Sequence, residues 1–438
     1  MPRHHAGSKR PGLGAANPAR CGAQAHDRLL RRAAAKRVSE SQTSRPDDSP
    51  TSRIPLDPLL AGALLLIGVA TLVPLHGPSG SSRIYWTLEF GDALRNIGLY
   101  VPFGVAWLAG HRSLAAGVVG ALLLSTGIEL LQLALPGRFS NPWDIASNAT
   151  GALLGGVLWR ERRRWLRPSK PLALGMALAC GAAIGLSGLA VGWLRVPFIE
   201  ELRIDSHWTP DFRYLSHYQG EVTGAAMNGI RLPHGRLAHG GPIREALSGE
   251  FDLRVIGRVG PEPPRPGILF LITDGRKRDL LAIIVEGSDL WVTYGDRARE
   301  FGLVPPRLPL VDALADAAPG NPLYVHLERR TEGFCLRVNG LEKCGLGYSA
   351  ADSWTLLVPF SVPTPWAGAL WLALMALPLG FWSRGPAAML GALALALLGL
   401  IAAPLFFPLL PTRFIHLLAI LAGAALGAGL QRATVGSP

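Results

Sequence analysis

The sequence predicts a polytopic α-helical membrane protein of about eight spans, with an extracytoplasmic antiparallel β-sandwich between spans five and six. Three observations predict this fold class. Hydrophobic residues make up 49% of the 438 residues and charged residues 17%, whereas soluble domains carry roughly 25% charged residues. Apolar stretches of about 20 residues, the length that crosses a bilayer, recur toward both ends of the chain. Between them the apolar residues alternate over short runs, which is typical of strands.

The first 53 residues form a basic segment rich in Arg, Lys, Ser, Pro and Gly. Such a composition cannot bury enough apolar surface to offset the entropy lost on ordering, so we expect a disordered cytoplasmic tail. It contains no short apolar core that ends at a small-residue cleavage site, so we expect the first span to stay as an uncleaved anchor. A start codon downstream of Met1 is an open alternative. The net charge of +12 lies largely in this tail and in one short loop, which favours a role in topology over nucleic-acid binding.

Eight spans are predicted from the apolar stretches, five before the β-rich insert and three after it. Their approximate ranges are 56–75, 93–109, 114–135, 144–159, 172–194, 364–382, 386–407 and 413–430. The expected domains are a tail over 1–53, five spans within 54–194, a sandwich within 195–363, and three spans with a short tail within 364–438.

Basic residues indicate on which side of the membrane each loop lies. They follow the second, fourth, sixth and eighth predicted spans, most densely in RERRRWLRPSK, from Arg160 to Lys170. Because cytoplasmic loops are enriched in Lys and Arg, we expect these loops and both termini in the cytoplasm. Residues about 195–363 are then extracytoplasmic, and the protein is a multi-pass protein of the cell inner membrane.

With this sidedness, polar residues of three spans and one turn meet at the outer membrane boundary. They are Asn96, Glu129, Gln132, Arg138, Asp144 and Asn148. Glu129 and Gln132 are three residues apart and share a helix face, and Asp144 and Asn148 share a face because they are four apart. Ionisable groups within or at the edge of a span are costly and usually mark a site in the bundle interior. We therefore expect a functional polar cluster at this level.

Each member of this set also has an ordinary structural explanation. Asp144 suits the cap of the fourth span, because helix N-termini favour acidic residues. Arg138 could be a loop charge among lipid headgroups, and Gln132 and Asn148 could form hydrogen bonds between helices. The sequence leaves both interpretations open.

Three segments carry these residues: NIGLYVPFGVAWL (96–108), GIELLQLALPGR (127–138) and DIASNATGALLGG (144–156). In order and spacing they resemble the VanZ-like membrane family. That family's pattern is Asn and Pro-Phe-Gly on one helix, Glu-x-x-Gln before a Gly-Arg turn, then Asp and Asn-x-x-Gly. The resemblance covers residues about 90–160. It implies a helical membrane domain and an association with low-level resistance to the glycopeptide teicoplanin, and it brings no established reaction.

The sequence of the insert, within 195–363, predicts a meander of β-hairpins. GILFLITDGRKRDLLAIIVEGSDLWVTYG contains three strand-like runs separated by turn residues, and EFDLRVIGRV alternates in the same way. We infer an antiparallel β-sandwich, and the pattern resembles concanavalin A/laminin G-like jelly rolls. The resemblance implies glycan or protein binding, sometimes with calcium. The sequence shows no calcium-loop signature, and we predict no metal site.

The stretch CLRVNGLEKC predicts a disulfide across a hairpin. Asn339-Gly340 is a strong two-residue turn signal, and outward pairing sets Cys335 opposite Cys344. Counting from the turn, this is a non-hydrogen-bonded pair with Cα atoms about 4.5 Å apart, which lies in the range of disulfides. An exterior location would preserve the bond. Two free thiols are the alternative.

Three classes of function fit these features. The favoured one is a non-enzymatic envelope protein whose polar cluster binds a lipid or glycan headgroup and whose sandwich contacts envelope polymer or a protein partner. The second is an enzyme on a lipid-linked substrate, with Glu129 or Asp144 as general base and Arg138 holding phosphate. The third is a transporter component. The sequence shows no nucleophile–base motif and no evident inverted repeat, so we expect no catalytic residue, no cofactor and no nucleic-acid partner.

Overall fold

A computed structural model describes residues 58–72, 83–84, 86–135, 139–200, 203–211, 216–238, 240–359 and 361–435. The predicted basic tail over 1–53 and the position of Arg138 lie outside the described residues.

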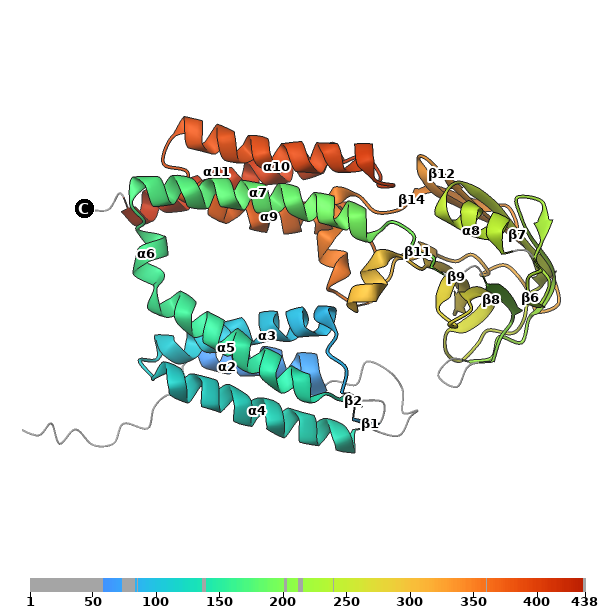
Figure 1. Ribbon diagram of the computed structural model, residues 1–438, viewed down its shortest axis with the longest axis horizontal. Helices are drawn as coiled ribbons and strands as arrows, with labels where there is room; N and C mark the ends of the chain where they lie inside the picture. The colour runs from blue at the N-terminus through green and yellow to red at the C-terminus, as the bar shows by residue number, and fades with distance from the viewer. Residues whose placement is uncertain are drawn as a thin grey trace, which may run out of the picture. The chain divides into compact units, whose positions relative to one another are not determined.

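The first group of helices contains the polar segments (Figure 1). It comprises α2 (Pro58–Leu72), α3 (Phe90–Ala109), α4 (Leu114–Ala134) and α5 (Pro142–Arg160), followed by the short α6 (Arg162–Leu166). Local sequence fixes the helix starts: the Ser113 side chain accepts a hydrogen bond from the Ala116 N–H, and the Asn141 side chain accepts one from the Trp143 N–H. The cap of α5 is therefore Asn141, and Asp144 lies in the first turn. A two-residue parallel pairing of β1 (Arg83–Ile84) with β2 (Phe139–Ser140) precedes this cap.

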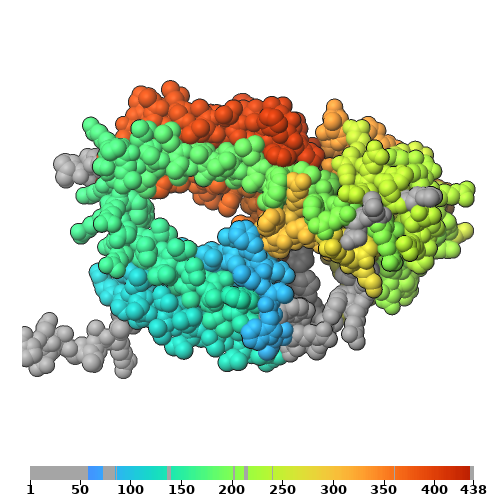
Figure 2. All heavy atoms as spheres, viewed as in Figure 1, coloured from blue at the N-terminus to red at the C-terminus, as the bar shows by residue number. Residues whose placement is uncertain are grey.

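The second group comprises α7 (Lys170–Leu194), α9 (Pro365–Trp382), α10 (Pro386–Phe406) and α11 (Phe414–Val435). Glycine and alanine let these helices approach closely. A Cβ at Gly399 would come within 2.3 Å of the Gly185 Cα, which shows backbone against backbone between α10 and α7. Figure 2 shows α7 in green and α10 in red side by side. In the other pair, a Cβ at Gly427 of α11 would come within 1.9 Å of the Leu377 carbonyl oxygen of α9.

A helix lies over each of the eight predicted spans within the described part of the chain. Five of these helices are long and apolar enough to cross a membrane, namely α4, α7, α9, α10 and α11. The helix α2 has 15 described residues, and α3 and α5 carry the polar side chains of the cluster, which lower their mean hydropathy. The protein is thus a multi-pass membrane protein, with five spans supported by length and composition.

The insert forms two six-stranded antiparallel sheets. The first has the order β11-β10-β9-β8-β3-β6, with β11 (Arg307–Leu310), β10 (Asp289–Tyr294), β9 (Asp279–Glu286), β8 (Gly267–Asp274), β3 (Ile204–Trp208) and β6 (Gly235–Arg236). The second has the order β14-β13-β12-β7-β4-β5, with β14 (Leu341–Leu346), β13 (Gly333–Val338), β12 (Pro322–Arg330), β7 (Phe251–Arg258), β4 (Glu221–Met227) and β5 (Ile230–Arg231). The remaining elements are α8 (Gly241–Ser248) and the 3-10 helices η1 (Arg297–Phe301) and η2 (Ala350–Leu356).

The alternation of buried and exposed side chains along the strands explains how the two sheets face each other. In β7 every second side chain, from Phe251 through Leu253 to Val255, is buried in the common core. The predicted meander corresponds to β8, β9 and β10, which are neighbours in their sheet. The predicted antiparallel β-sandwich is confirmed, and its jelly-roll type stays a prediction.

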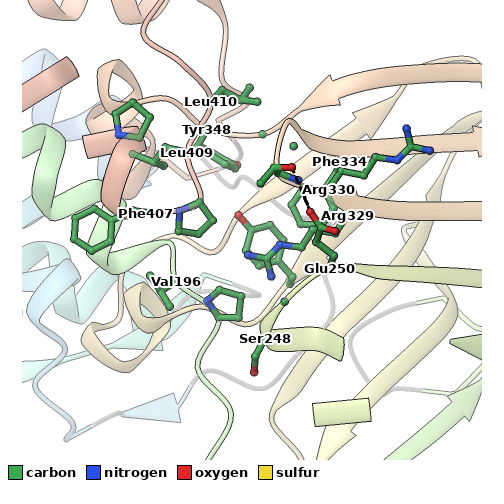
Figure 3. A pocket seen from close by; sticks show the side chains of 18 of the residues that line it. Val196, Ser248, Glu250, Arg329, Arg330, Phe334, Tyr348, Phe407, Leu409 and Leu410 are labelled. Carbon is green, nitrogen blue, oxygen red and sulfur yellow. Dashed lines mark hydrogen bonds between the residues drawn. The ribbon is translucent and has the colours of Figure 1, made fainter. Parts of the chain in front are cut away.

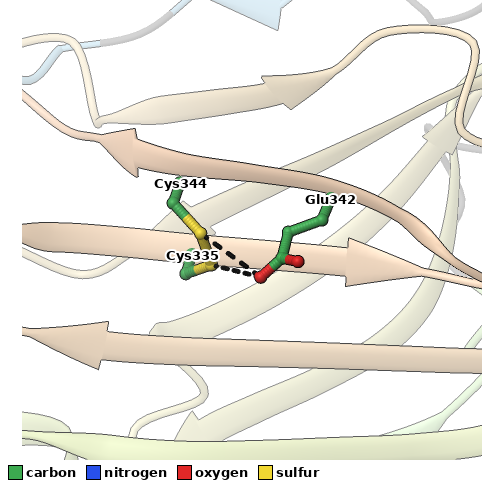
Figure 4. Close-up of side chains that lie close together, drawn as sticks. All are labelled: Cys335, Glu342 and Cys344. Atoms are coloured by element: carbon green, nitrogen blue, oxygen red, sulfur yellow. Dashed lines mark hydrogen bonds between the residues drawn. A yellow bond between two sulfur atoms is a disulfide. The ribbon is translucent and has the colours of Figure 1, made fainter.

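The predicted cysteine hairpin is also present. Asn339 and Gly340 both have positive φ, at 49° and 110°, as a tight hairpin turn requires. From this turn the register runs outward through Arg337 opposite Glu342 as predicted, and a bulge follows between Phe334 and Leu336. Cys335 and Cys344 form the predicted disulfide, with their Cα atoms 3.9 Å apart (Figure 4).

Candidate functional site

The structure brings six polar side chains of three helices together, and we call them the α3–α5 polar cluster. They are Asn96 and Tyr100 of α3, Ser125 and Glu129 of α4, and Asp144 and Asn148 of α5. Each helix contributes a pair four residues apart, so each pair lies on one face. Tyr100, Ser125, Glu129 and Asn148 are buried, with 0 to 5% of their surface exposed.

In one part of the cluster, a side-chain hydrogen bond links α5 to α4. The Asn148 Nδ2 donates to the Ser125 Oγ at 2.8 Å. The Tyr100 hydroxyl interacts with Ser125, but no described residue lies within hydrogen-bond geometry of it. The Asn148 Oδ1 is likewise buried without a partner there. A buried polar atom without a partner costs about 1–3 kcal/mol, and the described residues supply no partner for these two atoms.

A second part of the cluster lies toward the start of α5. The Glu129 Oε2 accepts from the backbone N–H of Asn141 at 2.7 Å, which ties the end of α4 to the cap of α5. The Asp144 carboxylate interacts with the Asn96 side chain and lies near the carboxylates of Glu129 and Asp92. Three carboxylates therefore gather at this end of the bundle.

Positive charge is sparse among the described residues of this region. Arg95 forms an ion pair with Asp92, one turn earlier on α3, and its Nη1 is buried without a hydrogen-bond partner there. Glu129 has no ion-pair partner within the described chain. The described part of the region thus carries an excess of negative charge.

Gln132 takes a different role from the other predicted site residues. Its Nε2 donates to the Thr71 carbonyl oxygen at 3.2 Å, which links α4 to α2. This contact is the hydrogen bond between helices that the sequence left open for Gln132.

Sequence reasoning missed Tyr100, Ser125 and Asn141. The signal for the first two was present, because Tyr100 follows Asn96 by four residues and Ser125 precedes Glu129 by four. Asn141 acts through its backbone N–H on Glu129, and no residue-type pattern reports such a contact.

Glycines hold α3 against α5 at the cluster. A Cβ at Gly151 would come within 2.3 Å of the Ile97 carbonyl oxygen, and one at Gly155 within 2.1 Å of the Val101 carbonyl oxygen. The third contact is reciprocal, because a Cβ at Gly104 would come within 2.0 Å of the Ala152 carbonyl oxygen. This close crossing brings Asn96 and Tyr100 next to the polar face of α5.

Residues 41–166 match the VanZ/LLP1 family model. The chain contains a VanZ-like domain. The α3–α5 polar cluster lies entirely within the residues that match this family model. Searches of curated proteins and of solved structures found no match to the chain.

Two groups of potential metal ligands lie on the sandwich, outside the VanZ-like domain. Cys335, Glu342 and Cys344 lie close together, but the two sulfurs are joined to each other. Asp252, His326 and Glu328 form the other group on β7 and β12. Their carboxylates already pair with Arg254 and Arg330, so the contacts within this group are explained by surface ion pairs.

Proposed function

We propose that this chain is a non-enzymatic integral membrane protein of the bacterial envelope, whose α3–α5 polar cluster binds the headgroup of an envelope lipid or glycan. The observation that carries the proposal is a set of buried polar atoms with no partner among the described residues, the Tyr100 Oη, the Asn148 Oδ1 and the Arg95 Nη1. A purely structural cluster would be expected to satisfy these atoms internally. The family resemblance supports the further proposal that the protein contributes to glycopeptide resistance of the teicoplanin type or to envelope polymer handling.

The charge of the cluster favours a headgroup that brings hydrogen-bond donors. Glu129 and Asp144 accept hydrogen bonds, and the described residues around them supply one guanidinium, which Asp92 already engages. An amine or several hydroxyls on the ligand would complement these carboxylates. The enzymatic alternative assigns Glu129 or Asp144 as a general base, and the nearness of the two carboxylates is the observation that favours it.

Glu129→Gln tests the proposed site. The amide oxygen of glutamine can still accept from the Asn141 N–H, so we expect the fold to persist while the charge is lost. Retention of phosphatidylethanolamine by the purified protein, measured by native mass spectrometry, should fall at least about tenfold, because a charge-assisted hydrogen bond contributes about 1.5–3 kcal/mol. Glycopeptide resistance of cells that express the protein should fall with it.

The matched control for this experiment is Thr150→Val on α5. Thr150 is exposed and its hydroxyl bonds to the Ala146 carbonyl of its own helix, so lipid retention and resistance should stay at the wild-type level. Unchanged retention and unchanged resistance in Glu129→Gln would contradict the proposed site. Loss of resistance with unchanged lipid retention, together with turnover of a lipid-linked substrate by the wild type, would favour the enzymatic alternative.

We also propose that the protein lies in the inner membrane with both termini in the cytoplasm, and that the sandwich lies outside, where it recognises envelope polymer or a protein partner. The distribution of basic residues supports this orientation. The Cys335–Cys344 disulfide supports it as well, because such bonds persist in oxidising compartments.

Cysteine labelling of intact cells tests this orientation. In a background without Cys21 and Cys180, a membrane-impermeant maleimide should label Asp316→Cys in the sandwich at once. It should label Ser169→Cys, at the start of α7, only after the cells have been permeabilised. Both residues are exposed, so access to the reagent depends on the side of the membrane. The reverse labelling pattern would refute the orientation.

A further inference from the structure

A cavity of about 510 Å³ lies where the sandwich meets the connection between α10 and α11 (Figure 3). One wall is apolar and consists of Pro404 to Leu410, at the end of the span-capable helix α10. Leu405 and Phe406 in this wall are 77% and 76% exposed. The backbone N–H of Leu410 donates to the Tyr348 carbonyl oxygen at 2.8 Å, which fixes this wall to the sandwich side.

The opposite wall contains a buried arginine in a position that normally takes an apolar residue. Along β12 the side chains of Leu323, Val325 and Leu327 point into the sandwich core, and Arg329 continues the same alternation. Arg329 is 8% exposed. Its neighbour Arg330 also lines the cavity, but its side chain extends away from it (Figure 3) and pairs with Glu328.

The charge of Arg329 is not compensated within the described residues. Its Nη1 donates to the Leu247 carbonyl oxygen at 3.1 Å, and its guanidinium lies 5.6 Å from the centre of the Phe334 ring. No carboxylate of the described chain forms an ion pair with it. Glu250, which also lines the cavity, accepts instead from the Thr331 N–H and hydroxyl.

A second buried arginine, Arg195, differs from Arg329 because a carboxylate compensates its charge. Arg195 donates to the Asp296 carboxylate at 2.8 Å. Burial acts to lower the pKa of Arg195, but Asp296, Tyr348 and Tyr294 together outweigh burial and the pKa is raised. Burial lowers the pKa of Arg329, and Tyr294 opposes this effect only in part.

Tyr294 supplies a second donor next to Arg329. It lines the cavity, and its ring stacks on Phe334 with centroids 5.1 Å apart. Its hydroxyl has no hydrogen-bond partner among the described residues. Within the described residues, the guanidinium has no carboxylate partner and the phenol has no acceptor. Such a pair suits a tetrahedral oxyanion, which a guanidinium can bind through two parallel hydrogen bonds.

We propose that this cavity binds the phosphate headgroup of a membrane lipid, with Arg329 and Tyr294 on the phosphate and the acyl chains along Leu405 and Phe406. The exposed apolar wall at the end of α10 favours a lipid over a soluble phosphate, because a tail can cover it. This site lies outside the VanZ-like domain and is independent of the function proposed for the α3–α5 polar cluster.

Binding of dioleoylphosphatidic acid to the full-length protein in detergent tests the proposal, with tryptophan fluorescence as the readout. Arg329→Met should weaken binding at least about tenfold, the change expected on losing a charge-assisted hydrogen bond. Dioleoylglycerol, which lacks the phosphate, and inorganic phosphate, which lacks the tails, should both bind far more weakly to the wild type. Arg330→Gln is the matched control and should bind like the wild type.

Thermal unfolding without lipid separates binding from folding. Arg329→Met keeps an unbranched apolar stem and removes an uncompensated charge, so its midpoint should equal or exceed that of the wild type. Tyr294→Phe keeps the ring stack and should also lower the lipid affinity at wild-type stability. Wild-type affinity in Arg329→Met, or equal losses in Arg330→Gln, would overturn the site. Inorganic phosphate that binds as tightly as phosphatidic acid would overturn the lipid as its occupant.

Discussion

Replacing Arg195 with methionine is expected to lower the free energy of unfolding by about 3–5 kcal/mol, because the change leaves the Asp296 carboxylate buried and unpaired. The side chains of Arg195 and Asp296 are 1% and 0% exposed. Arg195 also donates to the Val304 carbonyl oxygen and the Thr355 hydroxyl, and its guanidinium lies over the Tyr348 ring. Thermal unfolding in detergent, followed by tryptophan fluorescence, should show a large drop in the midpoint.

The double variant Arg195→Met with Asp296→Leu is the control for this prediction. Removing both charges leaves no buried ion, so most of the lost stability should return. If the single variant unfolds at the wild-type temperature, the Arg195–Asp296 pair does not contribute to the stability of the fold. If the double variant is no more stable than Arg195→Met, the loss comes from packing around Tyr348 and Val304 instead of from the unpaired carboxylate.

The second large effect is expected at Gly151 of α5. A valine there would place its Cβ within 2.3 Å of the Ile97 carbonyl oxygen, and backbone cannot move aside as a flexible side chain can. The helices α3 and α5 must then separate, at a cost of at least about 1–3 kcal/mol. The separation would also pull Tyr100 away from Ser125 and Asn148. We expect lower thermal stability together with loss of lipid retention at the α3–α5 polar cluster.

Gly98→Val on α3 provides the same substitution at a free position. Apart from its own stretch of helix, no described residue has an atom within 4 Å of a Cβ at Gly98, so stability should change by no more than about 1 kcal/mol. Equal behaviour of the two variants, in stability and in lipid retention, would show that the close crossing of α3 and α5 does not determine the site.

The helix positions, the strand meander and the cysteine hairpin could be predicted because each depends on local pattern. Apolar length determines where spans lie, and the Asn339-Gly340 turn determines which residues pair across the hairpin. The faces of the polar cluster followed from spacing alone, since Asp144 and Asn148 must share one side of a helix. These are properties of a single segment or of two adjacent ones.

The remaining features depend on contacts between distant segments. The inward direction of Arg329 can be read from the alternation of β12, but the lack of a facing carboxylate depends on how both sheets and the end of α10 pack. The partner of Gln132 is a backbone carbonyl 61 positions earlier. A residue type says nothing about which backbone group will face it.

The buried pair at the end of α7 has a consequence for the order of events during synthesis. Arg195 leaves the ribosome 101 residues before Asp296 and 160 residues before Thr355. At about 5–20 residues per second, the guanidinium therefore waits roughly 5–20 seconds for its carboxylate. Until then the C-terminal end of α7 lacks the ion pair that stabilises its native contacts. Nascent chains that stop before Asp296 should be cleaved by proteases near Arg195. Longer chains should be protected there, because Asp296 can then pair with Arg195.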